Sequence, residues 1–227
     1  MTNSAAAQQT DRESIFETVR MDILDGTIKP GTALKEVALA ERFGVSRTPI
    51  REVLSRLEEA SLVSRKARGL EVAAIDTEKI VQVYDARILL EEEVAGQSAM
   101  ERSIRDVFQL QALLERDRGL ENPTDRTLIR SNLEFHAAVW SAAHNPVLED
   151  LLTRLTTHLV HAPQSTLSVG NRWAESLDEH EALIEAIEKR DSARARDIAR
   201  AHFTTARSLR LDLLRRMVAE QQISPLA

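Results

Sequence analysis

The segment from residue 36 to residue 59 contains two stretches whose apolar residues recur at helical spacing, with a glycine between them. Gly44 stands where a helix often ends in a left-handed cap, and Ser46 is a preferred N-cap residue for the helix that follows. Pro49 then falls in a first helical turn, where its missing N–H is not required. This order predicts a helix-turn-helix, a motif whose second helix can lie in the major groove of DNA.

The second of these helices is predicted to be basic on one face and apolar on the other. Arg47 and Arg51 are one turn apart, with Thr48 beside them. The opposite face consists of Ile50, Val53, Leu54 and Leu57. Because the fork of donors on arginine suits guanine or phosphate, we predict that the basic face contacts DNA. The alternative is an amphipathic helix whose arginines are only solvated.

A basic hairpin is predicted directly after this helix. The letters LVSRKARGLEVAAI predict two short strands, Leu62–Arg65 and Leu70–Ala74, joined by a turn that contains Arg68 and Gly69. The window from Arg42 to Arg68 holds seven basic and three acidic residues, although the whole chain has a net charge of -6. We therefore expect one localised DNA-contacting surface, with the hairpin as a wing that reaches an adjacent groove.

Composition limits the kinds of site and the location that we expect for this chain of 227 residues. It contains no cysteine, so any metal site must be built from His, Asp, Glu or Asn. No apolar run approaches the roughly 20 residues that cross a bilayer, and the first residues do not resemble a signal peptide. We expect a cytoplasmic protein that does not contact a membrane.

After Asp76, the spacing of the apolar residues no longer predicts short elements but long amphipathic helices. We expect a disordered arm over residues 1–10, a winged helix over 11–75 and a helical domain over 76–227, so the fold class is mainly α. Within the first domain, a helix is expected from Asp11 or Ser14 to Gly26, before the two short helices. The helices expected in the second domain are 77–101, 103–119, 125–144, 146–161, 171–190 and 192–219.

Three histidines are spaced so that they can meet inside this helical domain. His180 and His202 lie eleven residues on either side of Asp191, the expected turn between two long helices. If those helices are antiparallel, the two imidazoles lie at the same level. His136 follows Asn132 by one helical turn, so both side chains point the same way. Three imidazoles and an amide oxygen suit zinc, nickel or manganese, although a helical histidine can equally be an ordinary core or surface residue.

The letters LAERFGVSRTPIREVLSRLEEASLV, followed by RGLEV, resemble the winged helix of the GntR family of bacterial transcription regulators. The helical remainder resembles the ligand-binding domain of the FadR-like subfamily. The resemblance implies that Arg47, Thr48 and Arg51 contact an operator, with Gly69 at the wing tip. It further implies a homodimer on a palindromic operator, and repression as the default. Val37 stands where some members carry a DNA-contacting arginine.

The resemblance extends to the metal-binding pattern of the family. The stretches NLEFHAAVWSAAHNP and EHEALIEAI, with a later AHF, match that pattern at His136, His180 and His202. Many members have aspartate where this chain has Asn132, and a neutral amide is a weaker metal ligand than a carboxylate.

Arg87 and Tyr84 are the residues that we assign to an effector. Arg87 is a basic residue among apolar neighbours on the first helix of the second domain, and Tyr84 lies one turn before it. Arg87 can pair with Glu91 at the next turn. Alternatively, as the resemblance suggests, Arg87 reaches the carboxylate of a small organic acid beside the metal, and Tyr84 adds a hydrogen bond.

These features leave three functions to compare. The first is a ligand-responsive transcription regulator, which is not an enzyme and has no catalytic residue. The second is a metal-dependent hydrolase, in which the ion activates water. It is disfavoured because no HExxH motif is present and because neither nearby glutamate shares a helix face with its histidine. Glu179 adjoins His180 and points about 100° away from it, and Glu134 lies two residues before His136, on roughly the opposite side of the helix. The third is a DNA-binding protein whose helical domain only dimerises.

Overall fold

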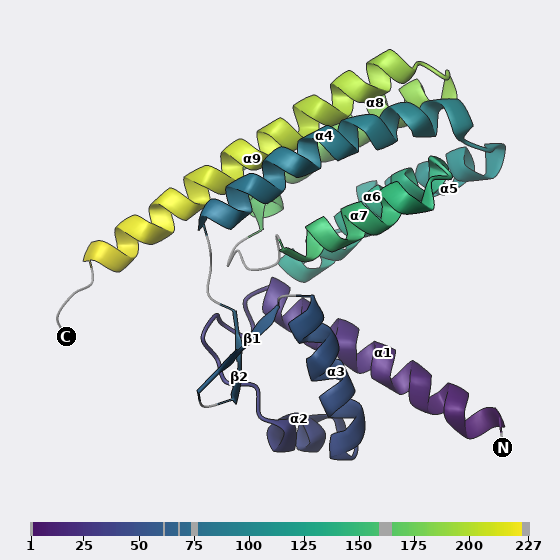
Figure 1. The fold of residues 1–227 in the computed structure, drawn as a ribbon. Coiled ribbons are helices and arrows are strands. Elements are labelled where there is room, and N and C mark those ends of the chain that lie inside the picture. The colour runs from purple at the N-terminus through teal and green to yellow at the C-terminus, as the bar shows by residue number, and fades with distance from the viewer. Residues whose placement is uncertain (1, 61, 68, 74–76, 159–164, 224–227) are drawn as a thin grey trace. The chain divides into compact units, whose positions relative to one another are not determined.

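The computed structural model describes residues 2–60, 62–67, 69–73, 77–158 and 165–223 (Figure 1). The chain separates into two compact units, of which the first extends to Asp76 and the second begins at Thr77. The first unit is a winged helix-turn-helix, and the second is built from helices. Among the described residues, no helix is both long enough and apolar enough to cross a membrane.

The first unit is organised around the packing of three helices and one hairpin. Its elements are α1 (Thr2–Leu24), α2 (Glu36–Phe43), α3 (Arg47–Glu59), β1 (Val63–Lys66) and β2 (Gly69–Val72). The apolar face predicted for α3 is buried completely or nearly so, together with apolar residues of α1 and the hairpin. Burial of these side chains holds α3 in place and leaves its basic face exposed.

The ends of the helices differ from expectation in two places. Gly44 has a φ of 66° and forms the predicted left-handed cap of α2. Ser46 occupies the N-cap position of α3, but its side chain makes no capping hydrogen bond, so it does not act as the predicted cap. Helix α1 begins at Thr2 and therefore includes residues 2–10, which were expected to be a disordered arm. Its alanines and glutamines have high helix propensity, which explains the extension.

The hairpin is tighter than predicted. β1 and β2 are antiparallel, and Lys66 pairs with Gly69, so Gly69 belongs to β2 rather than to the turn. Gly69 has a φ of 121°, a conformation that side-chain-bearing residues rarely adopt. Glu71 also forms a bridge with Ala33, in the segment between α1 and α2. The hairpin therefore requires glycine at position 69, the first residue of β2.

The second unit consists of long helices whose first residues lie within one position of the predictions. Its elements are α4 (Thr77–Glu101), α5 (Ile104–Arg118), α6 (Asp125–Ala142), α7 (Pro146–His158), the 3-10 helix η2 (Thr166–Ser168), α8 (Arg172–Glu188) and α9 (Ser192–Ile223). Helices α4 and α9 lie side by side along much of their length (Figure 1). The side chains of Ser103 and Thr124 both accept a backbone hydrogen bond at the N-cap position, which explains why α5 and α6 begin there. Asn171 precedes α8 without such a bond.

Candidate DNA interface and candidate metal centre

Within the first unit, α2, α3 and the wing surround a groove of about 590 Å³. Arg47, Arg51 and Gly69 line this groove, and Arg65 of β1 joins them. The side chains of Arg47 and Arg51 are 58% and 62% exposed, so their charges face solvent. Thr48 is exposed beside them. The fold therefore brings the basic positions of α3 and the wing to one concave surface, while Arg68 lies outside the described residues.

Glu36 holds the two arginines of α3 together. Its Oε2 accepts hydrogen bonds from Nη2 of Arg47 at 3.0 Å and from Nε of Arg51 at 2.9 Å. These bonds, first that from Arg47 and then that from Arg51, hold the pKa of Glu36 below its usual value. Glu36 is therefore an anion within a basic groove. Its role was not predicted, because it lies on a different helix, 11 residues before Arg47.

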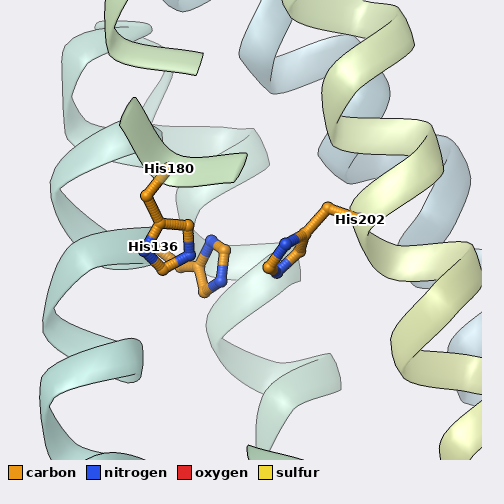
Figure 2. A group of neighbouring side chains, drawn as sticks. All are labelled: His136, His180 and His202. Carbon is orange, nitrogen blue, oxygen red and sulfur yellow. The ribbon is translucent and has the colours of Figure 1, made fainter. Parts of the chain in front are cut away.

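In the second unit, the three predicted histidines meet. His136 comes from α6, His180 from α8 and His202 from α9, and Figure 2 shows their rings turned toward one another. The ring centroids are 5.1 to 5.2 Å apart, and one ligand nitrogen from each ring lies within 4.8 Å of the others. The equal spacing of His180 and His202 about the turn thus places them at the same level.

The buried polar atoms around this cluster fit a metal ion. Among the described residues, Nε2 of His136, both ring nitrogens of His180 and Oδ1 of Asn132 are buried without a hydrogen-bond partner. Such atoms are costly to bury unless something binds them. Asn132 lies one turn before His136 on α6, so its oxygen is on the same face of the helix. The donor set of imidazole nitrogens and an amide oxygen matches zinc, nickel or manganese.

The electrostatic environment keeps these imidazoles neutral. Burial, followed by the neighbouring histidines, lowers the pKa of His136 well below its usual value, and burial does the same to the pKa of His180. Burial also lowers the pKa of His202, although its hydrogen bond to Glu179 opposes this shift. A metal ligand must be the neutral imidazole, so the site is ready for an ion at neutral pH.

A second layer of contacts surrounds His202. Its Nδ1 lies 2.5 Å from Oε2 of Glu179. Arg172 donates to both oxygens of that carboxylate, at 2.8 and 2.6 Å. Burial raises the pKa of Glu179, but the hydrogen bonds from His202 and Arg172 outweigh it and lower the pKa to about 2. This layer could not be predicted from the sequence, because the contacts depend on how α8 packs against α9.

Arg87 is paired and also retains a donor without a partner. Its Nε donates to Oε1 of Glu91 at 2.8 Å, as the spacing on α4 predicted, and Nε1 of Trp140 donates to the other oxygen of Glu91. All of these groups are buried, and Nη2 of Arg87 has no hydrogen-bond partner among the described residues. The guanidinium also lies over the ring of Phe203, 4.6 Å from its centroid. Because Phe203 contacts the rings of His136 and His202, the free end of Arg87 lies close to the histidine cluster.

Tyr84, Glu134 and Glu179 are the other residues whose role beside the histidines was considered from the sequence. Tyr84 is buried on α4, one turn before Arg87. Glu134 is exposed on α6 and pairs with Arg116, and Glu179 is already occupied by Arg172 and His202. Neither glutamate is therefore a free general base beside the histidines, which argues against a hydrolase.

Two family models match the sequence. Residues 11–69 match the model described as bacterial regulatory proteins, gntR family, and residues 82–205 match the FCD domain. The histidines of the cluster all fall within the second match. Both models describe parts of transcription regulators, so the comparison does not support the hydrolase alternative.

Curated relatives and solved structures agree with these matches. The chain is 31% identical over 192 residues to the uncharacterized HTH-type transcriptional regulator YdhC of Bacillus subtilis, covering 83% of this chain and 85% of the relative. It is 30% identical to the galactonate operon transcriptional repressor of Escherichia coli (84% and 92% covered) and 28% identical to the gluconate operon transcriptional repressor of Bacillus subtilis (77% and 74%). Among solved structures, E. coli McbR/YncC has the same fold, with a TM-score of 0.78 at 21% identity over 89% of this chain and 97% of that one.

Proposed function

The chain belongs to the GntR family of bacterial transcription regulators and carries an FCD domain, and from this premise we propose that it is a repressor released from its operator by a small organic acid. The observation that carries the proposal is the buried cluster of three histidines with unpartnered nitrogens, next to an arginine that retains a free donor. A domain that only dimerises does not require such a cluster.

The proposed DNA contacts are residues of α3 and of the wing in the first unit. Arg47, Thr48 and Arg51 enter the major groove from α3, while Arg68 and Gly69 approach the DNA from the wing. A homodimer would place one such surface on each half of a palindromic operator. The centres of the two half-sites would then lie one helical turn of DNA, about 34 to 36 Å, or a whole number of turns apart. The exposure of the arginines and the shape of the groove support this assignment.

The proposed effector site uses the polar atoms that the second unit leaves unpartnered. His136, His180 and His202, assisted by Asn132, would hold a zinc, nickel or manganese ion, which supplies positive charge for a carboxylate. Nη2 of Arg87 supplies a second positive partner, and Tyr84 lies within one turn of it. A buried carboxylate requires such partners because it loses its hydration.

The chemical class of the effector follows from the same atoms. A bound acid would meet the metal ion and the free donor of Arg87, and both of these bind oxygen atoms, so an acid that carries a hydroxyl group beside its carboxylate is favoured over a plain aliphatic acid. Two relatives are named as repressors of gluconate and galactonate operons, and both of those acids are polyhydroxylated. We propose a small hydroxy acid for this chain.

The test is effector-dependent release of operator DNA. Operator fragments are first selected from the source genome with the purified protein, and their binding is followed by fluorescence anisotropy. Gluconate, galactonate and simpler hydroxy acids are then added to metal-loaded and to EDTA-treated protein. We expect operator DNA to be released only from metal-loaded protein, and only by an acid whose shape fits the effector site. If a metal-free protein responds equally well, the metal has no part in effector binding; if no acid or metal binds, the second unit only dimerises.

A further inference from the structure

The carboxylate of Glu179 lies at the centre of a chain of contacts that ends at the histidine cluster. On one side it receives two hydrogen bonds from Arg172, whose side chain is 3% exposed. On the other side it lies 2.5 Å from Nδ1 of His202. Arg172 begins α8, Glu179 lies two turns along the same helix, and His202 belongs to α9, so the contacts cross between the two helices.

These contacts determine which nitrogen of His202 carries the proton. An ionised carboxylate only accepts hydrogen bonds, so Nδ1 of His202 must be the N–H that donates to Glu179. Nη2 of Arg172 also lies 3.3 Å from Nδ1, but a protonated nitrogen cannot accept from a guanidinium, so Glu179 is the partner. The lone pair of His202 is then on Nε2, the nitrogen on the other side of the ring.

We propose that Glu179, held in place by Arg172, is a positioning residue that fixes the tautomer and ring orientation of His202 for metal binding. This inference rests on the metal site in the proposed function. Metal-binding histidines generally donate their second N–H to a carboxylate or carbonyl, which orients the ring and makes the ligand nitrogen more basic. Nε2 of His136 and both ring nitrogens of His180 have no hydrogen-bond partner among the described residues, whereas Nδ1 of His202 contacts a carboxylate.

A purely structural ion pair is the competing explanation, and the surroundings disfavour it. Arg172 and Glu179 already satisfy one another with two hydrogen bonds, so the pair gains little stability from the histidine. Glu175, the other acidic residue near Arg172, is 3.9 Å from it and is 57% exposed. The side chain of Glu179 extends instead to the buried ring of His202.

The experiment compares Glu179→Ala with the matched control Glu175→Ala, which removes the same charge from the same helix without touching His202. Zinc or nickel affinity is measured on the full chain by competition with a chelator of known affinity. We expect Glu179→Ala to weaken metal binding about 10- to 100-fold, the usual effect of removing such an orienting partner. Glu179→Gln keeps the shape and a carbonyl acceptor, so it should fall between wild type and Glu179→Ala. Glu175→Ala should bind metal like wild type.

A measurement on the wild-type protein separates positioning from loss of fold. Long-range ¹⁵N NMR of metal-free protein should show His202 protonated at Nδ1, and thermal melts in EDTA should show that each variant folds. Equal metal affinity in Glu179→Ala and Glu175→Ala, or protonation of His202 at Nε2, would overturn the inference while leaving the metal site intact. A wild-type chain that binds no metal would overturn both the inference and the proposed metal site.

Discussion

In the first unit the buried side chains are apolar and the arginines face outward, whereas in the second unit arginine, glutamate and three histidines lie in the interior. Before residue 77, the only buried polar side chain that the structure describes is Asp22, which pairs with Arg42. In the second unit, Arg87, Glu91, Arg172 and the three histidines are all less than 10% exposed. One unit is therefore suited to bind a large charged partner at its surface, and the other to enclose a small one.

Charged side chains therefore affect the stability of the two units in different ways. Exposed arginines keep their hydration until DNA arrives, so they cost the fold little. Buried charges must be paired within the protein or by a ligand, and an unpartnered donor such as Nη2 of Arg87 is a cost that a bound anion removes. The following predictions test whether the two kinds of site are separable.

The largest effect is expected from His180→Ala. Removing one of three imidazoles should abolish stoichiometric metal binding and effector-dependent DNA release, because two nitrogens and an amide oxygen form a poor site. Operator affinity without effector should stay within about threefold of wild type, since a threefold change is only about 0.65 kcal/mol. Metal analysis and anisotropy measure the two properties. A large loss of basal DNA binding would mean that the units are not separable.

The next effect is expected from Leu57→Ala in the core of the first unit. Leu57 is completely buried, and truncating such a leucine costs about 2 to 5 kcal/mol of unfolding free energy. Both tryptophans, Trp140 and Trp173, belong to the second unit, so their fluorescence reports on that unit alone. In a urea titration, circular dichroism should show earlier partial unfolding, while the tryptophan transition stays unchanged. A parallel shift in fluorescence would contradict independent cores.

Arg47→Ala and Arg51→Ala should each weaken operator binding by about 1 to 3 kcal/mol, the range for a side chain that reads a base. Metal content and effector affinity should remain unchanged. Lys29→Ala is the control, because Lys29 is an exposed basic residue of the same unit that does not line the groove. If both arginine variants bind the operator as tightly as wild type, the assignment of α3 to the major groove is wrong.

The smallest effect compares two serines at helix N-caps. In the second unit, Ser103 accepts from the backbone N–H of Asp106 and its own N–H donates to that carboxylate, so Ser103→Ala should cost about 0.5 to 2 kcal/mol of unfolding free energy. In the first unit, Ser46 makes no such bond, so Ser46→Ala should cost much less. The urea midpoint of the second unit, followed by tryptophan fluorescence, tests Ser103→Ala. The urea midpoint of the first unit, followed by circular dichroism, tests Ser46→Ala. Equal costs would show that Ser46 does cap α3.

Local patterns were sufficient to predict most of the helices and the meeting of the histidines. Gly44 ends α2 and Ser103 begins α5 through hydrogen bonds to residues close to them in the chain. Such local effects can be predicted from the sequence. The equal spacing of His180 and His202 from Asp191 reflects the geometry of a helical hairpin, which was enough to predict that they meet.

The contacts that were missed depend on the angle and depth at which elements pack. Glu36 reaches Arg47 and Arg51 only because α2 crosses α3 at one particular place. Glu179 points about 100° away from His180 on its own helix, which excluded it as a general base but aims it at His202 on α9. The Nε–carboxylate bond of Arg87 was predicted from spacing, whereas its remaining free donor was not.

The pairing of α4 with α9 has a consequence for synthesis on the ribosome. The hydrophobic core of the first unit is built from residues before 77, so it can close as soon as those residues have emerged. The second unit pairs its first helix with its last, and His202 lies on that last helix. The histidine cluster is therefore completed only when α9 is released, after the DNA-contacting surface has formed. In every newly made molecule, the winged helix can therefore fold before the histidine cluster is complete.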